Sequence, residues 1–292
     1  MTPCRPSGRT QIFGIFGYPV RHTLSPQMHH AAFEALGLQN AYLPFEVHPD
    51  QLKKAVESIV PLGIRGVNVT IPHKKNVIPF LDQIDPEAKK MGAVNTIKNE
   101  AGRLIGFNTD GRGFVASLRE AGVDPAGMTV LLIGAGGAAR GLSVALLDAG
   151  VSEMHILARR AEAGLRLAEH LKSFSPGFKI SSQGFDVRNQ IVKGNTPVLL
   201  INTTPLGMGT EDPLPFPLSQ IGATWVIADL IYRPYETPLL TEAKKIGALT
   251  VPGLGMLLHQ GALAFEIWTG HLPPIEIMRQ ALLDAFSSIN PS

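Results

Sequence analysis

Apolar runs with the spacing of β-strands alternate along the chain with runs that have the spacing of helices. TQIFGIFG (10–17) and AYLPFEV (41–47) predict strands, and SPQMHHAAFEALG between them predicts a helix with Ser25 as N-cap and Pro26 at its first position. PDQLKKAVESIVPLG predicts a second helix, and AVNTIKNEAGRLIGFN predicts a hairpin that turns at residues 99–102. This alternation predicts the α/β fold class.

The third predicted strand, GVNVTI (66–71), leads into a lysine. Its valines and isoleucine alternate with Asn68 and Thr70, so the apolar set can face a core while the two polar side chains share the other face. Pro72 ends the strand, and Lys74 follows it. We interpret this strand end as a candidate binding site, although Lys74 next to Lys75 also fits plain surface charge.

A glycine-rich turn follows the apolar run Val130–Ile133, whose four consecutive apolar residues are typical of a strand buried on both faces. Gly134, Gly136 and Ala139 form the G-x-G-x-x-A version of the dinucleotide fingerprint, and a helical pattern begins immediately afterwards. Such a turn lets a pyrophosphate approach the backbone at a helix N-terminus. An ordinary tight strand-to-helix turn is the alternative, and the strand and helix on either side favour nucleotide binding.

The next predicted strand, EMHILA, ends in Ala158-Arg159-Arg160. A site for NAD usually carries an acidic residue here, which binds the ribose 2′-hydroxyl. No carboxylate is present to repel a 2′-phosphate, and a guanidinium can bind one through paired hydrogen bonds. The sequence therefore favours NADP over NAD. The alternative is that both arginines are only solvated charges on the surface. PVLLINTTPLGM and TWVIADLIY predict further strands of the same doubly wound sheet.

Uncharged hydrogen-bonding residues collect at predicted strand ends in the first part of the chain, which suits a small polyhydroxylated ligand; they are Thr23, Ser25, Asn68, Thr70, Asn95, Asn108 and Thr109. Each also has a structural explanation as a helix cap or a turn brace. Lys74 and Asp110 are the charged members of the group. A hydride that reaches a ketone leaves an oxyanion, which a lysine can protonate while an aspartate orients it.

Composition narrows the class of protein. The 292 residues are 45% hydrophobic and 17% charged with a formal net charge of +2, and they contain no basic block typical of nucleic-acid binding. We expect no membrane span, because no apolar run is long enough, and the first residues lack the apolar centre of a secretory signal. Cys4 is the only cysteine, which excludes an internal disulfide and any C-x-x-C metal site. A cytoplasmic protein without a metal is expected.

The sequence resembles the shikimate dehydrogenase family nearly from end to end. The motifs of that family occur in order as HTLSP, NVTIPHK, GAVNT, NTDG, GAGGAARG, NTTPLGM, DLIYRP and GLGMLLHQGALAF. The resemblance implies two α/β domains with the active site in the cleft between them. A substrate domain would comprise residues 1–110 and 254–292, and a Rossmann-type NADP-binding domain residues 111–253. The implied reaction is reduction of 3-dehydroshikimate by NADPH in aromatic amino-acid biosynthesis.

The resemblance also implies roles for individual residues. Lys74 and Asp110 would form the catalytic pair. Six residues would contact substrate hydroxyls or the carboxylate: Thr23, Ser25, Thr70, Asn95, Tyr232 and Gln260. The cofactor would be bound by Gly134, Ala135, Gly136, Gly137, Ala138, Arg159, Arg160, Thr204, Leu230 and Gly253. The predicted partners are a small-molecule substrate and NADP, with neither nucleic acid nor membrane, in a monomer or homodimer.

Two departures from the family pattern leave alternatives open. Thr23 stands where the family usually has the first serine of S-x-S-P, and its extra methyl group could shift preference between shikimate and quinate. Ala158-Arg159-Arg160 replaces the usual N-R-T, which keeps the first arginine but loses the asparagine. A quinate/shikimate dehydrogenase with NAD or dual cofactor use is therefore the main alternative. A non-catalytic nucleotide- or ligand-binding homologue is a lesser one.

Overall fold

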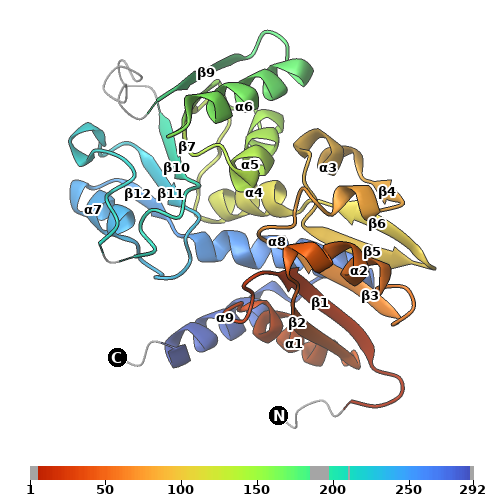
Figure 1. The fold of residues 1–292 in the computed structure, drawn as a ribbon. Coiled ribbons are helices and arrows are strands. Elements are labelled where there is room, and N and C mark those ends of the chain that lie inside the picture. Colours follow the sequence, from red (N-terminus) through yellow and green to blue (C-terminus); the bar gives the residue numbers. More distant parts are fainter. Residues whose placement is uncertain (1–5, 185–196, 210, 290–292) are drawn as a thin grey trace. The chain divides into compact units, whose positions relative to one another are not determined.

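The computed structural model describes residues 6–184, 197–209 and 211–289, and its ribbon is shown in Figure 1. The chain divides into two compact units. Unit 1 consists of Met1–Thr109 and Leu258–Ser292, and unit 2 consists of Asp110–Leu257. The second boundary lies inside helix α8 (Gly253–Thr269), which therefore begins in unit 2 and ends in unit 1.

Unit 1 contains a mixed six-stranded sheet with the strand order β2-β1-β3-β5-β6-β4. The strand bounds are β1 (Gln11–Gly17), β2 (Asn40–Glu46), β3 (Ile64–Val69), β4 (Gln83–Ile84), β5 (Thr96–Glu100) and β6 (Arg103–Phe107). Strand β1 pairs in parallel with both β2 and β3, whereas β5 is antiparallel to β3 and to β6. The helical segments of this unit are α1 (Ser25–Ala35), η1 (Pro49–Gln51), α2 (Leu52–Glu57), η2 (Ile78–Phe80), α3 (Pro86–Met91) and α9 (Ile275–Ile289).

Both faces of this sheet carry buried side chains. Phe13 of β1 lies 5.4 Å, ring centroid to ring centroid, from both Phe33 of α1 and Trp268 of α8. Phe16, which lies on the opposite face because side chains alternate along a strand, belongs to a second cluster with Val56 and Ile59. The core of unit 1 therefore has a layer on each side of the sheet.

The predicted hairpin and helices of unit 1 are largely present. Strands β5 and β6 are joined by Ala101-Gly102, both with positive φ, and Asn99 Oδ1 accepts a hydrogen bond from Gly102 N at 2.9 Å. Helix α1 begins at Ser25 itself, so Ser25 is not the N-cap that the pattern predicts. The helix predicted over residues 49–63 is shorter, since α2 ends at Glu57 and Pro61 has no N–H to continue it.

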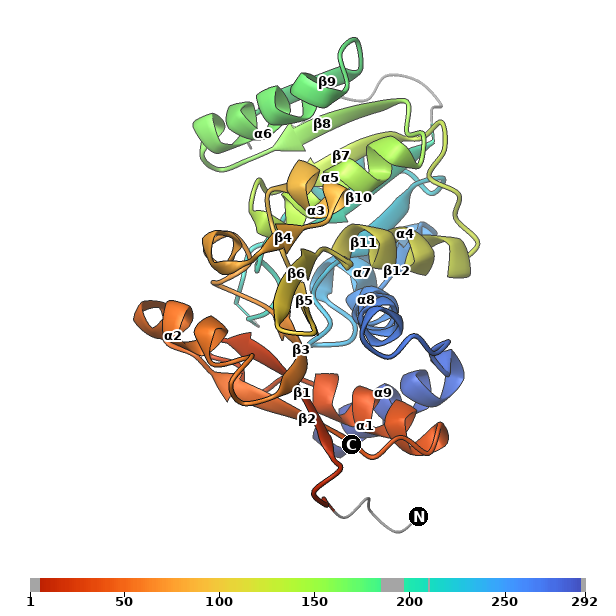
Figure 2. The same cartoon turned by 90° about the vertical axis from the view of Figure 1, so that its right-hand side faces the viewer.

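Unit 2 contains a fully parallel sheet with the order β12-β11-β10-β7-β8-β9. Its strands are β7 (Thr129–Ile133), β8 (Glu153–Leu157), β9 (Lys179–Gln183), β10 (Val198–Asn202), β11 (Val226–Asp229) and β12 (Leu249–Val251). Its helical segments are α4 (Asp110–Glu120), α5 (Gly137–Asp148), α6 (Ala161–Phe174), η4 (Leu218–Gln220) and α7 (Pro238–Ile246). Figure 2 shows α6 running alongside β8 and β9.

This strand order is that of a doubly wound nucleotide-binding sheet. From β7 the chain adds β8 and β9 on one side, and it then returns to add β10, β11 and β12 on the other side. The reversal lies between β7 and β10, which are neighbours although two strands separate them in sequence. Ligands of such sheets bind outside the carboxyl ends of the strands at this switch point. The predicted α/β class with a Rossmann-type unit is confirmed.

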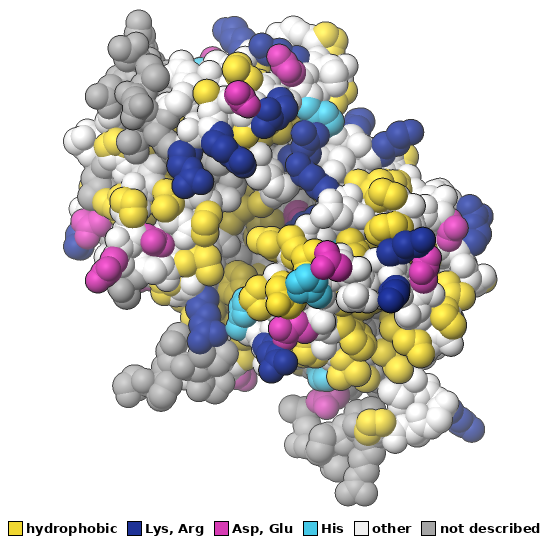
Figure 3. Space-filling model, in the orientation of Figure 1, with side chains coloured by type: hydrophobic (Ala, Val, Ile, Leu, Met, Phe, Trp, Pro, Cys, Tyr) yellow, Lys and Arg dark blue, Asp and Glu magenta, His cyan; other side chains and the backbone are white. Residues whose placement is uncertain are grey.

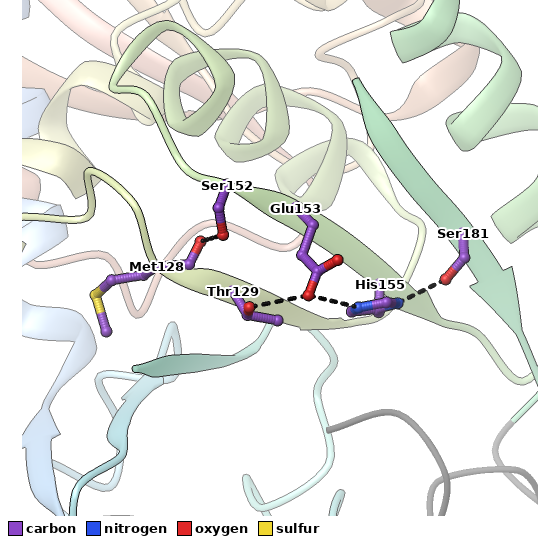
Figure 4. A network of polar contacts seen from close by, with 6 residues as sticks. All are labelled: Met128, Thr129, Ser152, Glu153, His155 and Ser181. Atoms are coloured by element: carbon purple, nitrogen blue, oxygen red, sulfur yellow. Dashed lines mark hydrogen bonds and ion pairs between the residues drawn. The ribbon is translucent and has the colours of Figure 1, made fainter. Parts of the chain in front are cut away.

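Polar side chains form cross-strand pairs between β7 and β8 and between β8 and β9 (Figure 4). Thr129 Oγ1 donates to Glu153 Oε1 at 3.1 Å, and His155 Nδ1 lies 2.7 Å from Ser181 Oγ. Both pairs are direct register partners. Leu131 and Ile133 lie on the same face of β7 as Thr129, and they pack in the apolar cluster that includes residues of α7. No helix in the described part of the chain is long and apolar enough to cross a membrane.

Candidate active site

The glycine-rich turn lies at the switch point of the unit 2 sheet. Gly134 follows β7 with φ of 109°, a conformation that side chains disfavour. A β-carbon at this position would lie 2.5 Å from Thr203 Oγ1, and that hydroxyl donates to Ile133 O at 2.7 Å. The first glycine of the fingerprint is therefore required by the close approach of the segment that follows β10.

The rest of the turn borders open space. A β-carbon on Gly136 or on Gly137 would meet nothing within 4 Å. The neighbouring residues Ala135 and Ala138 are half-buried. Helix α5 begins at Gly137, so its free N–H groups and positive dipole end are at the same place. This arrangement fits a pyrophosphate group, because the open space and the donors coincide.

Both predicted 2′-phosphate ligands are exposed. Arg159 and Arg160 follow β8 and precede α6, and Arg160 is the N-cap residue of that helix. Figure 3 shows lysine and arginine side chains gathered over the part of unit 2 that carries α5, α6 and β9. Burial lowers the pKa of Arg140 on α5 below its ordinary value. Arginine side chains nevertheless stay protonated in proteins. The turn therefore lies in a positively charged neighbourhood that suits phosphate groups.

A buried aspartate holds together the two segments that follow β10 and β11. Asp229 Oδ1 accepts from Asn202 Nδ2 at 3.1 Å and from Ile231 N at 3.1 Å, and its Oδ2 accepts from Thr237 Oγ1 at 2.8 Å. Asn202 Oδ1 in turn accepts from Thr204 Oγ1 at 2.7 Å. Burial raises the pKa of Asp229, and these hydrogen bonds oppose the rise. The network fixes Thr204 and the backbone next to Leu230.

Three further predicted residues lie close to this network in sequence or space. Leu230 is half-buried directly after β11, and Gly253 at the start of α8 approaches it so closely that a β-carbon would lie 2.4 Å from Leu230 O. The predicted nicotinamide neighbours are thus in contact. Tyr232 is half-buried, and burial raises the pKa of its phenol, with the charge of Arg233 acting in the opposite direction.

In unit 1, Asn95 braces the segment that precedes Asp110. Its Nδ2 donates to Thr109 Oγ1 at 2.9 Å, and its Oδ1 accepts from Thr109 N at 2.8 Å. Asn108 Nδ2 donates to Ala93 O at 2.9 Å. Asn95, Asn108 and Thr109 are all buried. The three side chains thus have structural roles, although the sequence also presents them as candidates for binding a polyhydroxylated ligand.

The two hydroxyl residues of the HTLSP motif contact each other. Thr23 Oγ1 donates to Ser25 Oγ at 3.1 Å and accepts from Ser25 N at 3.3 Å. Ser25 is 3% exposed, whereas Thr23 is half-buried. Thr70 is also half-buried, and a β-carbon on Gly17 would lie 2.4 Å from Thr70 Cγ2, so the end of β1 leaves just enough room for that side chain. Thr23 and Ser25 thus lie together at the start of α1, and Thr70 lies beside the end of β1.

Lys74 lies in a turn that is held at several points. His73 is buried, and its Nε2 lies 2.7 Å from Val47 O, while Lys74 O accepts from Val94 N at 2.7 Å. The Lys74 side chain itself is half-buried. Asp110, which is 4% exposed, is the first residue of α4 and of unit 2. Gln260 is half-buried on the unit 1 part of α8.

Sequence reasoning missed the residue at the centre of the unit 1 polar network. Tyr42 is fully buried, and its hydroxyl donates to Asn68 Oδ1 at 2.7 Å. The sequence presents Asn68 as one of the uncharged polar residues at predicted strand ends, and not as the partner of a buried tyrosine. Tyr42 lies in an otherwise apolar strand pattern, which predicts its burial but not its hydrogen bond. Its pairing partner could be found only from the order of the strands.

Comparison with known proteins agrees with this architecture. A family model described as the shikimate dehydrogenase substrate binding domain matches residues 15–97, and one described as the shikimate 5'-dehydrogenase C-terminal domain matches residues 253–283. A protein named shikimate dehydrogenase (NADP(+)) from Desulforamulus reducens is 47% identical over 287 residues, which is 97% of this chain and 98% of that protein.

Solved structures extend the comparison to the fold. Shikimate 5-dehydrogenase from Thermus thermophilus, in complex with NADP(H) and shikimate, matches with a TM-score of 0.83 and 37% identity, over 94% of this chain and 99% of that chain. Quinate dehydrogenase from Corynebacterium glutamicum, in complex with NAD, matches with a TM-score of 0.87 and 28% identity, over 94% and 99% of the chains. Fold and site thus define a two-unit dehydrogenase of the dinucleotide-binding class. The chain belongs to the shikimate dehydrogenase family.

Proposed function

We propose that this chain is an NADP-dependent oxidoreductase that interconverts 3-dehydroshikimate and shikimate in aromatic amino-acid and chorismate biosynthesis. The observation that carries the proposal is the match along 97% of the chain to a relative whose name states both this substrate and this cofactor. The glycine turn with its open space supports the cofactor assignment, and the hydroxyl-rich strand ends support the substrate assignment. The one cysteine is consistent with a reducing compartment, and we expect the enzyme to act in the cytoplasm.

Unit 2 would bind the cofactor through three groups of residues. The turn from Gly134 to Ala138 would hold the pyrophosphate at the start of α5. Arg159 and Arg160 would contact the 2′-phosphate, because a guanidinium offers paired donors to phosphate oxygens. Thr204, Leu230 and Gly253 would line the nicotinamide end, where the Asp229 network keeps the backbone in place.

Unit 1 would bind most of the substrate. Uncharged donors and acceptors at fixed positions suit a ring with hydroxyl groups and one carboxylate. We propose that Thr23, Ser25, Thr70, Asn95, Tyr232 and Gln260 contact the substrate. Asn95 already holds Thr109 in the described structure, so it would contact the substrate as a rigid side chain.

Lys74 and Asp110 would carry the proton chemistry. When bound, NADPH supplies the hydride that reaches the ring carbonyl carbon. The ammonium group of Lys74 would donate its proton to the carbonyl oxygen, which becomes the hydroxyl group of shikimate, and in the oxidation direction neutral Lys74 would take that proton back. Asp110 would orient Lys74 and accept a hydrogen bond from a substrate hydroxyl. The cation also stabilises negative charge that develops on oxygen.

The second candidate is a quinate/shikimate dehydrogenase with NAD or dual cofactor use. Thr23 in place of serine and Ala158 in place of asparagine favour it, as does the likeness to an NAD-bound quinate dehydrogenase. A non-catalytic homologue would have no use for Lys74 and Asp110 together with the hydroxyl set. Initial rates with shikimate and quinate, each with NADP⁺ and NAD⁺, separate the three. We expect the highest kcat/KM for shikimate with NADP⁺; faster quinate oxidation would favour the second candidate, and no turnover with any pair the third.

A further inference from the structure

A buried relay of hydrogen bonds in unit 1 runs from Asn68 to the residue before Asp110. Asn68 Nδ2 donates to Thr96 Oγ1 at 3.1 Å, and Thr96 Oγ1 donates to Asn95 Oδ1 at 2.9 Å. Asn95 Oδ1 also accepts from Thr109 N at 2.8 Å. The four residues of the relay are at most 5% exposed, so water does not compete for these bonds.

Backbone groups at both ends of the relay fix the direction of every bond. Thr109 N can only donate, so Asn95 must present its amide oxygen there, and Thr96 must donate to that same oxygen. At the other end, Asn95 O can only accept, and Asn68 Nδ2 donates to it at 3.2 Å. The one proton of Thr96 is thus used on Asn95, while the oxygen of Thr96 accepts from Asn68.

Strand pairing places Thr96 in this relay. Asn68 of β3 and Thr96 of β5 are directly opposite each other in an antiparallel pair, so their side chains lie on the same face of the sheet. The hydroxyl of Tyr42 donates to Asn68 Oδ1 at 2.7 Å. The oxygen and the nitrogen of the Asn68 amide are therefore both held, and Thr96 Oγ1 keeps a fixed donor.

The Asn95 amide needs support from the sheet, because the last torsion of an asparagine side chain has broad energy wells. Asn95 exchanges two hydrogen bonds with Thr109, one from Asn95 Nδ2 to Thr109 Oγ1 and one from Thr109 N to Asn95 Oδ1. Those two bonds alone would let the two residues shift together. The bond from Thr96 Oγ1 ties the amide to β5 instead, and the χ1 torsion of a threonine is itself stiff.

We propose that Thr96 is a positioning residue of the substrate site, whose hydroxyl group ties the Asn95 amide, and through it the backbone at Thr109, to the sheet of unit 1. Asp110 is the next residue in the chain, so the same tie steadies the backbone from which its side chain extends. The proton of Thr96 stays on Asn95, so Thr96 acts through Asn95 and not on the substrate directly. This inference rests on the proposed contact between Asn95 and the substrate.

Removal of the hydroxyl group alone tests the inference. Thr96→Val keeps the shape of the side chain, and Thr96→Ser keeps the hydroxyl group but loses the methyl group. The values of kcat, KM for shikimate and KM for NADP⁺ are measured below the lowest thermal midpoint of the set. We expect Thr96→Val to lower kcat/KM for shikimate about five- to thirtyfold, the effect of one lost buried hydrogen bond, with KM for NADP⁺ unchanged. Thr96→Ser should restore most of the lost kcat/KM.

The matched control is Thr129→Val, because Thr129 is also a buried threonine and donates to Glu153 Oε1 at 3.1 Å. This variant should lower the thermal midpoint, as Thr96→Val does, while its kcat/KM for shikimate stays close to that of the parent. If Thr96 served only the stability of the fold, the two valine variants would have the same kcat/KM. That result, or equal losses of kcat/KM in Thr96→Val and Thr96→Ser, would overturn the inference.

Asn95→Ala supplies a second test, because it removes the side chain through which Thr96 acts. In the Asn95→Ala background, Thr96→Val should have no further effect on kcat/KM for shikimate. Equal effects of Thr96→Val in both backgrounds, or an unchanged kcat/KM in Thr96→Val alone, would overturn the inference and leave the proposed function intact. If Asn95→Ala alone leaves kcat/KM for shikimate unchanged, the substrate contact of Asn95 is wrong, and the inference falls with it. A parent protein that does not oxidise shikimate would overturn both.

Discussion

The backbone at Gly253 lies against the carbonyl group of Leu230, at a distance that leaves no room for a β-carbon between them. The contact joins the first residue of α8 to the residue after β11. Its geometry contrasts with that of Gly136, where a β-carbon would meet nothing in the protein. One glycine is thus required by the fold, and the other borders space that we assign to the cofactor.

Gly136→Ala is predicted to weaken NADP⁺ binding at least tenfold without destabilising the protein. Gly136 has φ of −82°, which alanine adopts freely, so the free energy of unfolding should change by less than about 0.5 kcal/mol. The added methyl group would occupy the space of the pyrophosphate. Gly253→Ala should instead destabilise the protein by about 1–3 kcal/mol, because its methyl group would overpack against the carbonyl group of Leu230. Titration calorimetry and chemical unfolding of both variants give the comparison, and unimpaired NADP⁺ binding by Gly136→Ala would contradict the pyrophosphate assignment.

Arg159→Ala is predicted to weaken NADP⁺ binding by roughly 1.5–3 kcal/mol, the range for loss of a charged hydrogen bond, and to leave NAD⁺ binding almost unchanged. The measurement is the dissociation constant of each cofactor. Arg166→Ala on α6 is the control, because Arg166 is also exposed but pairs with Glu162 at 3.4 Å. Equal losses for the two cofactors would mean that Arg159 has a structural role, and the preference for NADP would lose its main support in the sequence.

Thr23→Ser is predicted to change the ratio of kcat/KM for shikimate to that for quinate while NADP⁺ binding stays the same. Quinate carries an extra ring hydroxyl and a puckered ring, and the methyl group of threonine stiffens the side chain that contacts Ser25. One methyl group usually shifts discrimination by about 1–3 kcal/mol, so the wild type should still prefer shikimate. A ratio that does not move would place the methyl group away from the substrate ring.

His29 should make the protein less stable in acid. Its ring is fully buried, neither ring nitrogen has a hydrogen-bond partner, and burial together with the charge of His30 lowers the pKa of His29 to about 3. The unfolded chain binds a proton near pH 6.5, whereas the folded protein does not until about pH 3, so stability is lost as the pH falls through this window. The loss is about 1.4 kcal/mol per pH unit at its steepest.

Replacement of His29 by phenylalanine isolates this contribution. The variant keeps an aromatic ring against Tyr42 but cannot be protonated. Urea unfolding at pH 6, 5 and 4 should show a steeper loss of stability for the wild type than for His29→Phe, whatever the difference between them at neutral pH. Parallel curves would mean that His29 is protonated inside the folded protein.

Local sequence patterns predict the parts of this protein that depend on local chemistry. Val130–Ile133 and the following glycines predict β7, its turn and the start of α5. A strand buried on both faces requires consecutive apolar residues, and the positive φ at Gly134 favours glycine. The β5–β6 hairpin is predicted for the same reason, through Asn99 and Gly102.

Contacts between distant segments could not be predicted in this way. The two-residue strand β4 and the edge strand β9 have weak patterns of their own and form by pairing with β6 and β8. Tyr42 lies in a strand pattern that predicts burial, but its bond to Asn68 depends on β1 lying between β2 and β3. His29 likewise lies on the buried face of an amphipathic helix, and only the packing of α1 against Tyr42 shows that its ring is unpaired.

If Lys74 supplies the proton for reduction of the substrate, its loss should slow the reaction far more than the loss of the neighbouring Lys75. The measurement is kcat for shikimate oxidation with NADP⁺ across pH in Lys74→Ala and in Lys75→Ala, whose side chain is exposed. Lys74→Ala should lower kcat by about two to four orders of magnitude, the usual worth of a positioned acid–base group, with a smaller effect on KM. Lys75→Ala should remain close to the wild type. Near-normal turnover of Lys74→Ala across the pH range would contradict the role assigned to this residue.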